Sequence, residues 1–157
     1  TPLTGSDQFR HDLGFDAVLN YKTTSDYRGA LKELCPNGID VYFENVGGPI
    51  FDQILMRMNL NGRVSICGLI AGYNDAGKPV PGPYAFGMVL MRRLRVQGFI
   101  VSDFLPRFPE ATADLLAWAQ AGKLKTLEDV RTGFDALPET LRQLLRGDKH
   151  GKLVLRP

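Results

Sequence analysis

The sequence predicts an α/β protein built on a doubly wound parallel sheet, and two stretches carry that prediction. One is GIDVYFENVGG at residues 38–48, a β-rich run that ends abruptly in Asn and paired Gly; the other is GRVSICG at residues 62–68. A segment of helical periodicity separates them, which makes a βαβ unit. Parallel strands end at one edge of a sheet, where open α/β folds bind their ligands. We therefore expect Asn45, Gly47 and residues 67–73 to share one rim.

The elements before this unit follow from short local patterns. Residues 5–14 are predicted to form a short polar helix and AVLN at residues 17–20 a strand. Ser25 is the expected N-cap of a helix that carries Leu31 and Leu34.

Within the unit, the apolar side chains of the first strand alternate with Asp40, Tyr42 and Glu44. Pro49 suits the first turn of the connecting helix. The side chains that recur at helical spacing to cover the sheet are Phe51, Ile54, Leu55 and Met58. Gly62 is expected to start the second strand, and Cys67 to lie at its buried end.

The second half of the chain continues the alternation of elements. Residues 72–83 are dense in Gly, Pro, Asn and Asp, which predicts a loop or lid at the functional rim. A strand at residues 95–101 and a helix from Pro109 to Gly122 follow. The tail is predicted to hold a polar segment at 123–133, a leucine-rich helix closed by Gly147, and a strand at 153–155.

Composition bears on the possible partners. The 157 residues suit one domain, and a net charge of +2 does not indicate a nucleic-acid partner. Arg92, Arg93 and Arg95 form the one basic cluster, which lacks interleaved aromatics and is interpreted as a solvated edge. No apolar run is long enough to span a bilayer. Cys35 and Cys67 are too few for a disulfide framework, so we expect reduced thiols and a cytoplasmic protein.

Two motifs that would define a site are absent from the sequence. No strand is followed by the Gly-x-Gly-x-x-Gly turn that holds a dinucleotide pyrophosphate, and Gly47-Gly48 does not replace it. His11 and His150 are far apart, and no Cys/His cluster has ligand spacing, so no metal site is predicted.

Six blocks resemble, in order, successive segments of zinc-independent medium-chain dehydrogenases/reductases. They are GFDAVLNYKT, GIDVYFENVGG, NGRVSICGLIAGYN, LRVQGFIV, AGKLK and GDKHGK. The similarity is to the branch of prostaglandin, 2-alkenal and curcumin reductases, and it covers only the carboxyl-terminal half of a family member. It implies a Rossmann-like sheet that lacks its first strand and Gly-rich loop. Residues 1–121 would be the distal part of the dinucleotide-binding domain, and residues 122–157 would return to the absent substrate domain.

The missing half has a topological consequence. In the usual strand order, the lost strands separate residues 17–20 from residues 39–43. Unpaired inner strands are prone to association. We therefore expect a fragment or truncation of a longer chain, or a rearrangement or association that covers the gap; the intact mass of the native protein tests this.

The resemblance also implies an activity: the NADP(H)-dependent reduction of the carbon–carbon double bond of an α,β-unsaturated ketone or aldehyde, with this half inactive alone. Hydride goes to the β-carbon, and the negative charge that builds on the carbonyl oxygen needs a hydrogen-bond donor. Tyr73 matches the tyrosine that ends the family's CGxxxxY block and is the candidate catalytic donor. The alternative is a loop tyrosine that packs on the cofactor.

Further cofactor contacts are implied in the same way. Tyr21 would lie near the adenosine phosphate and Asn45 would face the dinucleotide; the alternatives are a strand-end and a turn-forming residue. The residues implied to line the nicotinamide side are Cys67, Gly68, Leu69, Ile70, Ala71, Gly72, Tyr73, Phe99, Ile100 and Val101. Gln8 stands where the family has a lysine that reads the 2′-phosphate, so NAD stays an alternative to NADP, and Lys149 replaces a family asparagine.

Three classes of function therefore stay open. The first is the enone or enal reductase, expected to be a homodimer that pairs through the sheet edge at residues 95–101. The second is a non-catalytic nucleotide-binding or dimerisation fragment. The third is another Rossmann-like enzyme, such as a methyltransferase.

Overall fold

The computed structural model describes residue 10 and residues 13–73, 77, 82–147 and 151–157. It divides into two compact units, one formed by Leu19–Phe108 and the other by Thr1–Val18 with Pro109–Pro157. Gln8, His11, Lys149 and His150 lie outside the described residues, as do most of the predicted helix at 5–14 and part of the loop at 72–83.

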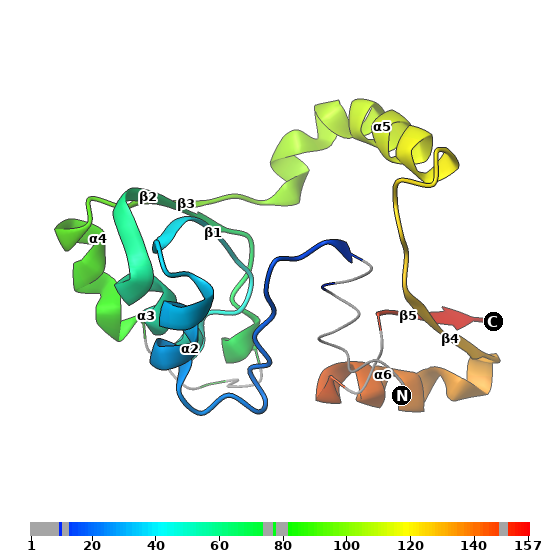
Figure 1. Cartoon of the computed structure of the whole chain (residues 1–157). Coiled ribbons are helices and arrows are strands. Elements are labelled where there is room, and N and C mark those ends of the chain that lie inside the picture. The colour runs from blue at the N-terminus through cyan, green and yellow to red at the C-terminus, as the bar shows by residue number, and fades with distance from the viewer. Residues whose placement is uncertain (1–9, 11–12, 74–76, 78–81, 148–150) are drawn as a thin grey trace. The chain divides into compact units, whose positions relative to one another are not determined.

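The first unit is built on a parallel sheet in the order β1-β2-β3 (Figure 1). The strands are β1 (Ile39–Glu44), β2 (Met58–Ile66) and β3 (Arg95–Gly98). Glu44 of β1 lies opposite Ile66 of β2, which lies opposite Gly98 of β3. All three strands therefore end together, which confirms the predicted βαβ unit and its common rim.

Helices connect and cover these strands. They are α2 (Tyr27–Leu34), α3 (Gly48–Arg57) and α4 (Gly87–Met91), with 3₁₀ turns η1 (Ile70–Gly72), η2 (Tyr84–Phe86) and η3 (Val101–Arg107). Pro49 does lie in the first turn of α3. Successive right-handed crossovers in one direction place α3 and α4 on the same face of the sheet. The buried core that results is formed by Leu31, Phe51, Ile54, Leu55, Met58, Val64 and Leu94.

The other face of β1 is open. Val41 and Phe43 are 57% and 55% exposed, whereas Tyr42 is half-buried and Glu44 has no exposed surface. The register of β1 on β2 shifts between Ile39 and Val41, so the apolar residues beyond the shift face away from the core. Among the described residues β1 pairs only with β2, which leaves its second edge unpaired.

Several predicted boundaries in this unit were wrong. Residues 17–20 are not a strand; Leu19 instead packs against the core, because no described strand lies beside it to pair with. The N-cap of α2 is Asp26 rather than Ser25, and its carboxylate accepts a 2.9 Å hydrogen bond from the Gly29 amide.

The strand boundaries also moved. β2 begins at Met58, which is already extended and buried, rather than at Gly62. β3 ends at Gly98, opposite Ile66 at the end of β2. It does not reach Val101, which begins η3.

The second unit contains all but the first residue of α5 (Phe108–Gln120), together with β4 (Glu128–Thr132), η4 (Phe134–Ala136), α6 (Leu137–Arg146) and β5 (Lys152–Arg156). β4 and β5 form a two-stranded parallel sheet. The segment predicted to be merely polar thus contains a strand. Gly147 ends α6 in the left-handed conformation, with φ of 73°, as the sequence predicted. No helix in the described part of the chain has the length and apolar character to cross a membrane.

Candidate functional site

Two loops meet at the rim where β1 and β2 end. The first is residues 45–48, and the second is residues 67–73. The Ile70 amide donates a 3.2 Å hydrogen bond to the Asn45 carbonyl, and the Ala71 amide donates a 2.9 Å bond to the Val46 carbonyl. The structure therefore brings Asn45 together with most of the segment predicted to line the nicotinamide side.

Glycines make this close approach of the loops possible. Gly47 has φ of 73°, and a Cβ placed on it would lie 3.1 Å from Leu69 Cδ2. A Cβ on Gly68 would lie 3.3 Å from Asn45 Oδ1. Glycine alone adopts such a positive φ at no steric cost and leaves room for another backbone or a ligand to approach. The two loops of the rim are consequently packed main chain against main chain.

The segment after β3 joins the same rim. The Phe99 amide donates a 3.1 Å hydrogen bond to the Ile66 carbonyl at the end of β2, and its ring lies 5.9 Å from that of Phe43. Ile100 and Val101, which follow, are exposed. Phe99, Ile100 and Val101 are thus placed beside the end of the central strand.

The candidate tyrosines differ in position. The Tyr73 amide donates to the Ile70 carbonyl at 3.1 Å, which closes η1, and its side chain is 70% exposed. Its phenol is therefore available to a ligand. Tyr21 lies in the turn before α2, where its carbonyl accepts a 2.8 Å hydrogen bond from the Tyr27 hydroxyl, and no described contact joins it to the rim.

Cys67 was predicted to be buried at a strand end, and this was wrong. The residue is exposed just beyond β2, and its amide donates a 2.8 Å hydrogen bond to the Glu44 carbonyl. The strand ends one residue earlier than the β-rich pattern suggested, so the thiol faces outward.

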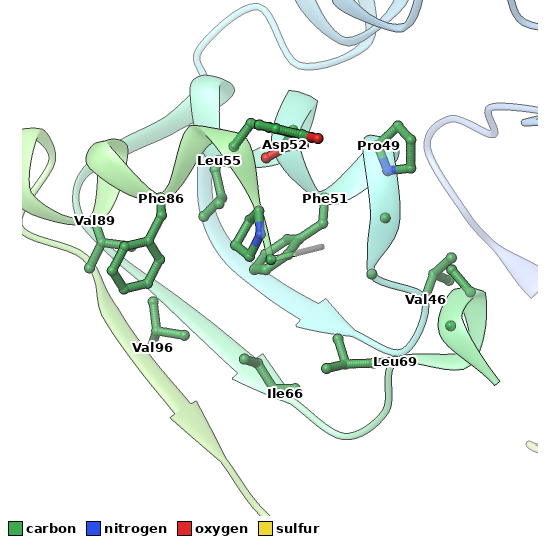
Figure 2. A pocket seen from close by; sticks show the side chains of 17 residues that line it. Val46, Pro49, Phe51, Asp52, Leu55, Ile66, Leu69, Phe86, Val89 and Val96 are labelled. Carbon is green, nitrogen blue, oxygen red and sulfur yellow. The ribbon is translucent and has the colours of Figure 1, made fainter. Parts of the chain in front are cut away.

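An apolar cavity of about 620 Å³ adjoins the rim, between α3, η2, α4 and the sheet. Figure 2 shows its walls, with Phe51 and Leu55 from α3 and Phe86 and Val89 from the opposite side. Gly47, Leu69 and other rim residues close one end. Among the described residues of the lining, Asp52 is the one charged side chain, and its Oδ1 accepts a 2.8 Å hydrogen bond from the Ala85 amide.

Sequence reasoning missed Glu44, the buried acid at the end of β1. Its Oε1 accepts hydrogen bonds from the amides of Val46 and Gly47. On the same side of the strand, burial raises the pKa of Tyr42 to about 12, and the negative charge of Glu44 adds to the rise. The sequence did offer a signal for this role. An acid stands at the end of the predicted strand, and the glycine that precedes the next helix has no side chain to cap it.

No group of three or more His, Cys, Asp or Glu side chains within the described ranges is arranged to hold a metal ion.

A parallel sheet whose strands end together in glycine-rich loops defines a Rossmann-like α/β domain. The model of the zinc-binding dehydrogenase family matches residues 6–120, and the chain belongs to that family.

The chain is similar to several reductases along almost all of its length. It is 37% identical to the NADPH-dependent curcumin reductase of Escherichia coli, covering 97% of this chain and 46% of that protein. It is 37% identical to the NADP(+)-dependent 2-alkenal reductase of Nicotiana tabacum, covering 95% and 43%. The crystal structure of CurA from Vibrio vulnificus in complex with NADPH superposes with a TM-score of 0.84 at 34% identity, covering 97% and 46%. The chain spans less than half the length of these relatives and matches their carboxyl-terminal half.

Proposed function

We propose that the chain is the cofactor-binding half of an NADP(H)-dependent oxidoreductase that reduces the carbon–carbon double bond of α,β-unsaturated ketones or aldehydes. The observation that carries this proposal is the rim formed by residues 45–48 and 67–73, joined by main-chain hydrogen bonds. A similar solved structure was determined with NADPH. Its relatives are named as NADPH-dependent or NADP(+)-dependent reductases.

The residues at the rim suit a dinucleotide. A Cβ at Gly47 or Gly68 would press against Leu69 or Asn45, so these glycines let the two loops of the proposed cofactor site pack closely together. The Asn45 amide offers both a donor and an acceptor at the end of β1. In this proposal Asn45, the segment from Cys67 to Tyr73, and the segment from Phe99 to Val101 hold the nicotinamide side, and Tyr21 holds the adenosine end.

NADPH, when bound, supplies the hydride. The task left to the protein is to stabilise the negative charge that develops on the carbonyl oxygen of the substrate. Tyr73 is proposed to donate a hydrogen bond from its phenol to that oxygen, which requires no charge on the side chain. Its exposure at the end of η1 leaves the hydroxyl available to a substrate.

The wider assignment rests on the resemblance of the six sequence blocks and on the place of β3 at the edge of the sheet. We propose that residues 1–121 belong to the dinucleotide-binding domain and residues 122–157 to the catalytic domain. We further propose that the enzyme is a cytoplasmic homodimer, paired through the β3 edge, and that it works without zinc. The cavity beside the rim suits an apolar part of the substrate, because apolar side chains form most of its wall.

The test uses the chain in its full natural length. Calorimetry with NADPH, NADH and S-adenosylmethionine separates a reductase from a methyltransferase, and loss of NADPH absorbance with an enone separates an enzyme from a non-catalytic fragment. We expect binding of NADPH and its consumption in the presence of the enone. Binding of S-adenosylmethionine alone, or NADPH binding with no turnover of any enone or enal, would contradict the proposal.

A further inference from the structure

Among the described residues of the first unit, Glu44 is the one charged residue that is buried, and its environment is unusual. It closes β1 and has no exposed surface. Carboxylates are rarely buried completely unless they are paired, because removing the charge from water is costly. No Lys, Arg or His side chain within the described ranges forms an ion pair with it, so its hydrogen bonds must account for its position.

The side chain of Glu44 holds the loop that carries Asn45. Oε1 accepts one hydrogen bond from the Val46 amide and a second, of 2.9 Å, from the Gly47 amide. Gly47 is the N-cap of α3 and has no side chain to cap the helix, and the first turn of α3 contains no acid. Glu44 therefore supplies an acceptor for the amide of the N-cap residue Gly47 and for the Val46 amide before it.

The main chain of Glu44 holds the second loop of the rim. Its carbonyl accepts hydrogen bonds from the amides of Cys67, at 2.8 Å, and Gly68, at 3.2 Å. One residue thus fixes both loops, the first through its carboxylate and the second through its carbonyl. Because the hydrogen bonds that Oε1 accepts come from backbone amides, the effect of Glu44 on Asn45 is on the path of the chain.

The other carboxylate oxygen, Oε2, is buried and has no hydrogen-bond partner among the described residues. We propose that Glu44 is a positioning residue for the cofactor site, which sets the place of Asn45 by holding the amides of Val46 and Gly47. This inference rests on the proposed function, since Asn45 matters only if the rim binds the cofactor.

The test compares two substitutions at Glu44 in the full-length protein. Glu44→Gln keeps an acceptor oxygen for the two amides, whereas Glu44→Leu keeps the approximate volume and removes the acceptor. We expect the NADPH Kd of Glu44→Gln to stay within about threefold of the parent and that of Glu44→Leu to rise about tenfold or more, because buried amides lose a charged partner. Glu44→Gln behaving like Glu44→Leu would overturn the acceptor role.

The variant Met58→Ala serves as a control for effects that come only from a general loss of stability. Met58 is almost fully buried at the start of β2, opposite Ile39 and at the far end of the sheet from Glu44. We expect this variant to lower the unfolding temperature with little change in NADPH Kd. Equal losses of affinity in Met58→Ala and Glu44→Leu, for equal losses of stability, would show that Glu44 acts only through folding and would overturn the proposal.

A double-mutant cycle with Asn45→Ala tests whether Glu44 acts through the loop. Once the Asn45 side chain is gone, misplacing the loop matters less, so we expect Glu44→Leu to raise the NADPH Kd by a smaller factor in that background. Fully additive effects would count against the positioning role.

Hydrogen exchange provides a readout that does not depend on Glu44→Leu being folded. The amides of Val46 and Gly47 should be protected in the parent protein and in Glu44→Gln; exchange at the rate of exposed amides in either would overturn the inference. A parent protein that does not bind NADPH at all, yet protects these two amides, would instead contradict the proposed function.

Discussion

The amide of Ala71 donates a 2.9 Å hydrogen bond to the carbonyl of Val46, so the loop after β1 and the turn after β2 are joined by their main chains. A joint of this kind does not depend on side-chain identity. It depends on the backbone conformation of the flanking residues, and Gly47 with its φ of 73° is the flanking residue that admits least change.

Gly47→Ala should therefore damage the site. Gly47 lies at φ 73° and ψ −156°, a region essentially restricted to glycine, where another residue costs about 1–3 kcal/mol. Its Cβ would also lie 3.1 Å from Leu69 Cδ2. We expect a lower urea midpoint and weaker NADPH binding. Gly87→Ala is the matched control, because that glycine has φ of −55° and open space around it; it should leave both measurements unchanged or slightly raise stability.

Tyr73→Phe isolates the proposed hydrogen bond to the carbonyl oxygen. Removing one such donor lowers kcat by about 10²-fold in other enzymes that stabilise an oxyanion. We expect a similar fall for enone reduction, while the NADPH Kd stays the same because the ring is kept. A full-rate Tyr73→Phe enzyme would assign Tyr73 to packing instead.

Asn45→Ala should weaken the binding of NADPH without destabilising the fold. Loss of one hydrogen bond of about 0.5–1.5 kcal/mol corresponds to a rise of roughly two- to tenfold in the NADPH Kd. Asn59→Ala provides the comparison. The Asn59 amide donates to Asp40 and to the Asn37 carbonyl at the opposite end of β1, so this variant should lose stability and keep its affinity. The reverse pattern would remove Asn45 from the cofactor site.

The raised pKa of Tyr42 predicts that the free energy of unfolding falls at alkaline pH. Its pKa is raised from 10.0 to about 12, first by burial and then by the charge of Glu44. The folded chain thus holds the phenolic proton more tightly than the unfolded chain, so this contribution is complete below pH 10 and is lost as the pH rises towards 12. Tyr42→Phe keeps the ring that stacks on Phe51 and should reduce this fall in the free energy of unfolding, measured by urea titration. Identical pH profiles for the two proteins would show that Tyr42 does not contribute.

The parts of the fold that could be predicted depend on local chemistry. Pro49 marks the start of α3, and Gly147 marks the end of α6, because each residue restricts or permits particular backbone angles. The shared rim followed from the parallel βαβ unit. These inferences needed no knowledge of distant contacts.

The misses have a different cause. AVLN at residues 17–20 has β-favouring side chains, but a strand needs a neighbour, and pairing cannot be read from a single segment. The buried position of Glu44 depends on the register shift between Ile39 and Val41, which alternation alone does not reveal. Cys67 is exposed because β2 ends at Ile66, and such boundaries are set by the partner strands.

Because side chains alternate along β1, the number of residues in the strand determines which face of the sheet its last side chains occupy. Tyr42 and Glu44 lie on the inner face because they are two residues apart, while Phe43 between them lies on the open face. Inserting a single residue after Tyr42 would reverse the parity of everything beyond it, turning the carboxylate outward and an apolar side chain towards the first turn of α3. Lengthening the strand by two residues would preserve parity but move the acid along the sheet by one full repeat. Engineering of this domain must therefore conserve the residue count of β1 as strictly as the identity of its final acid.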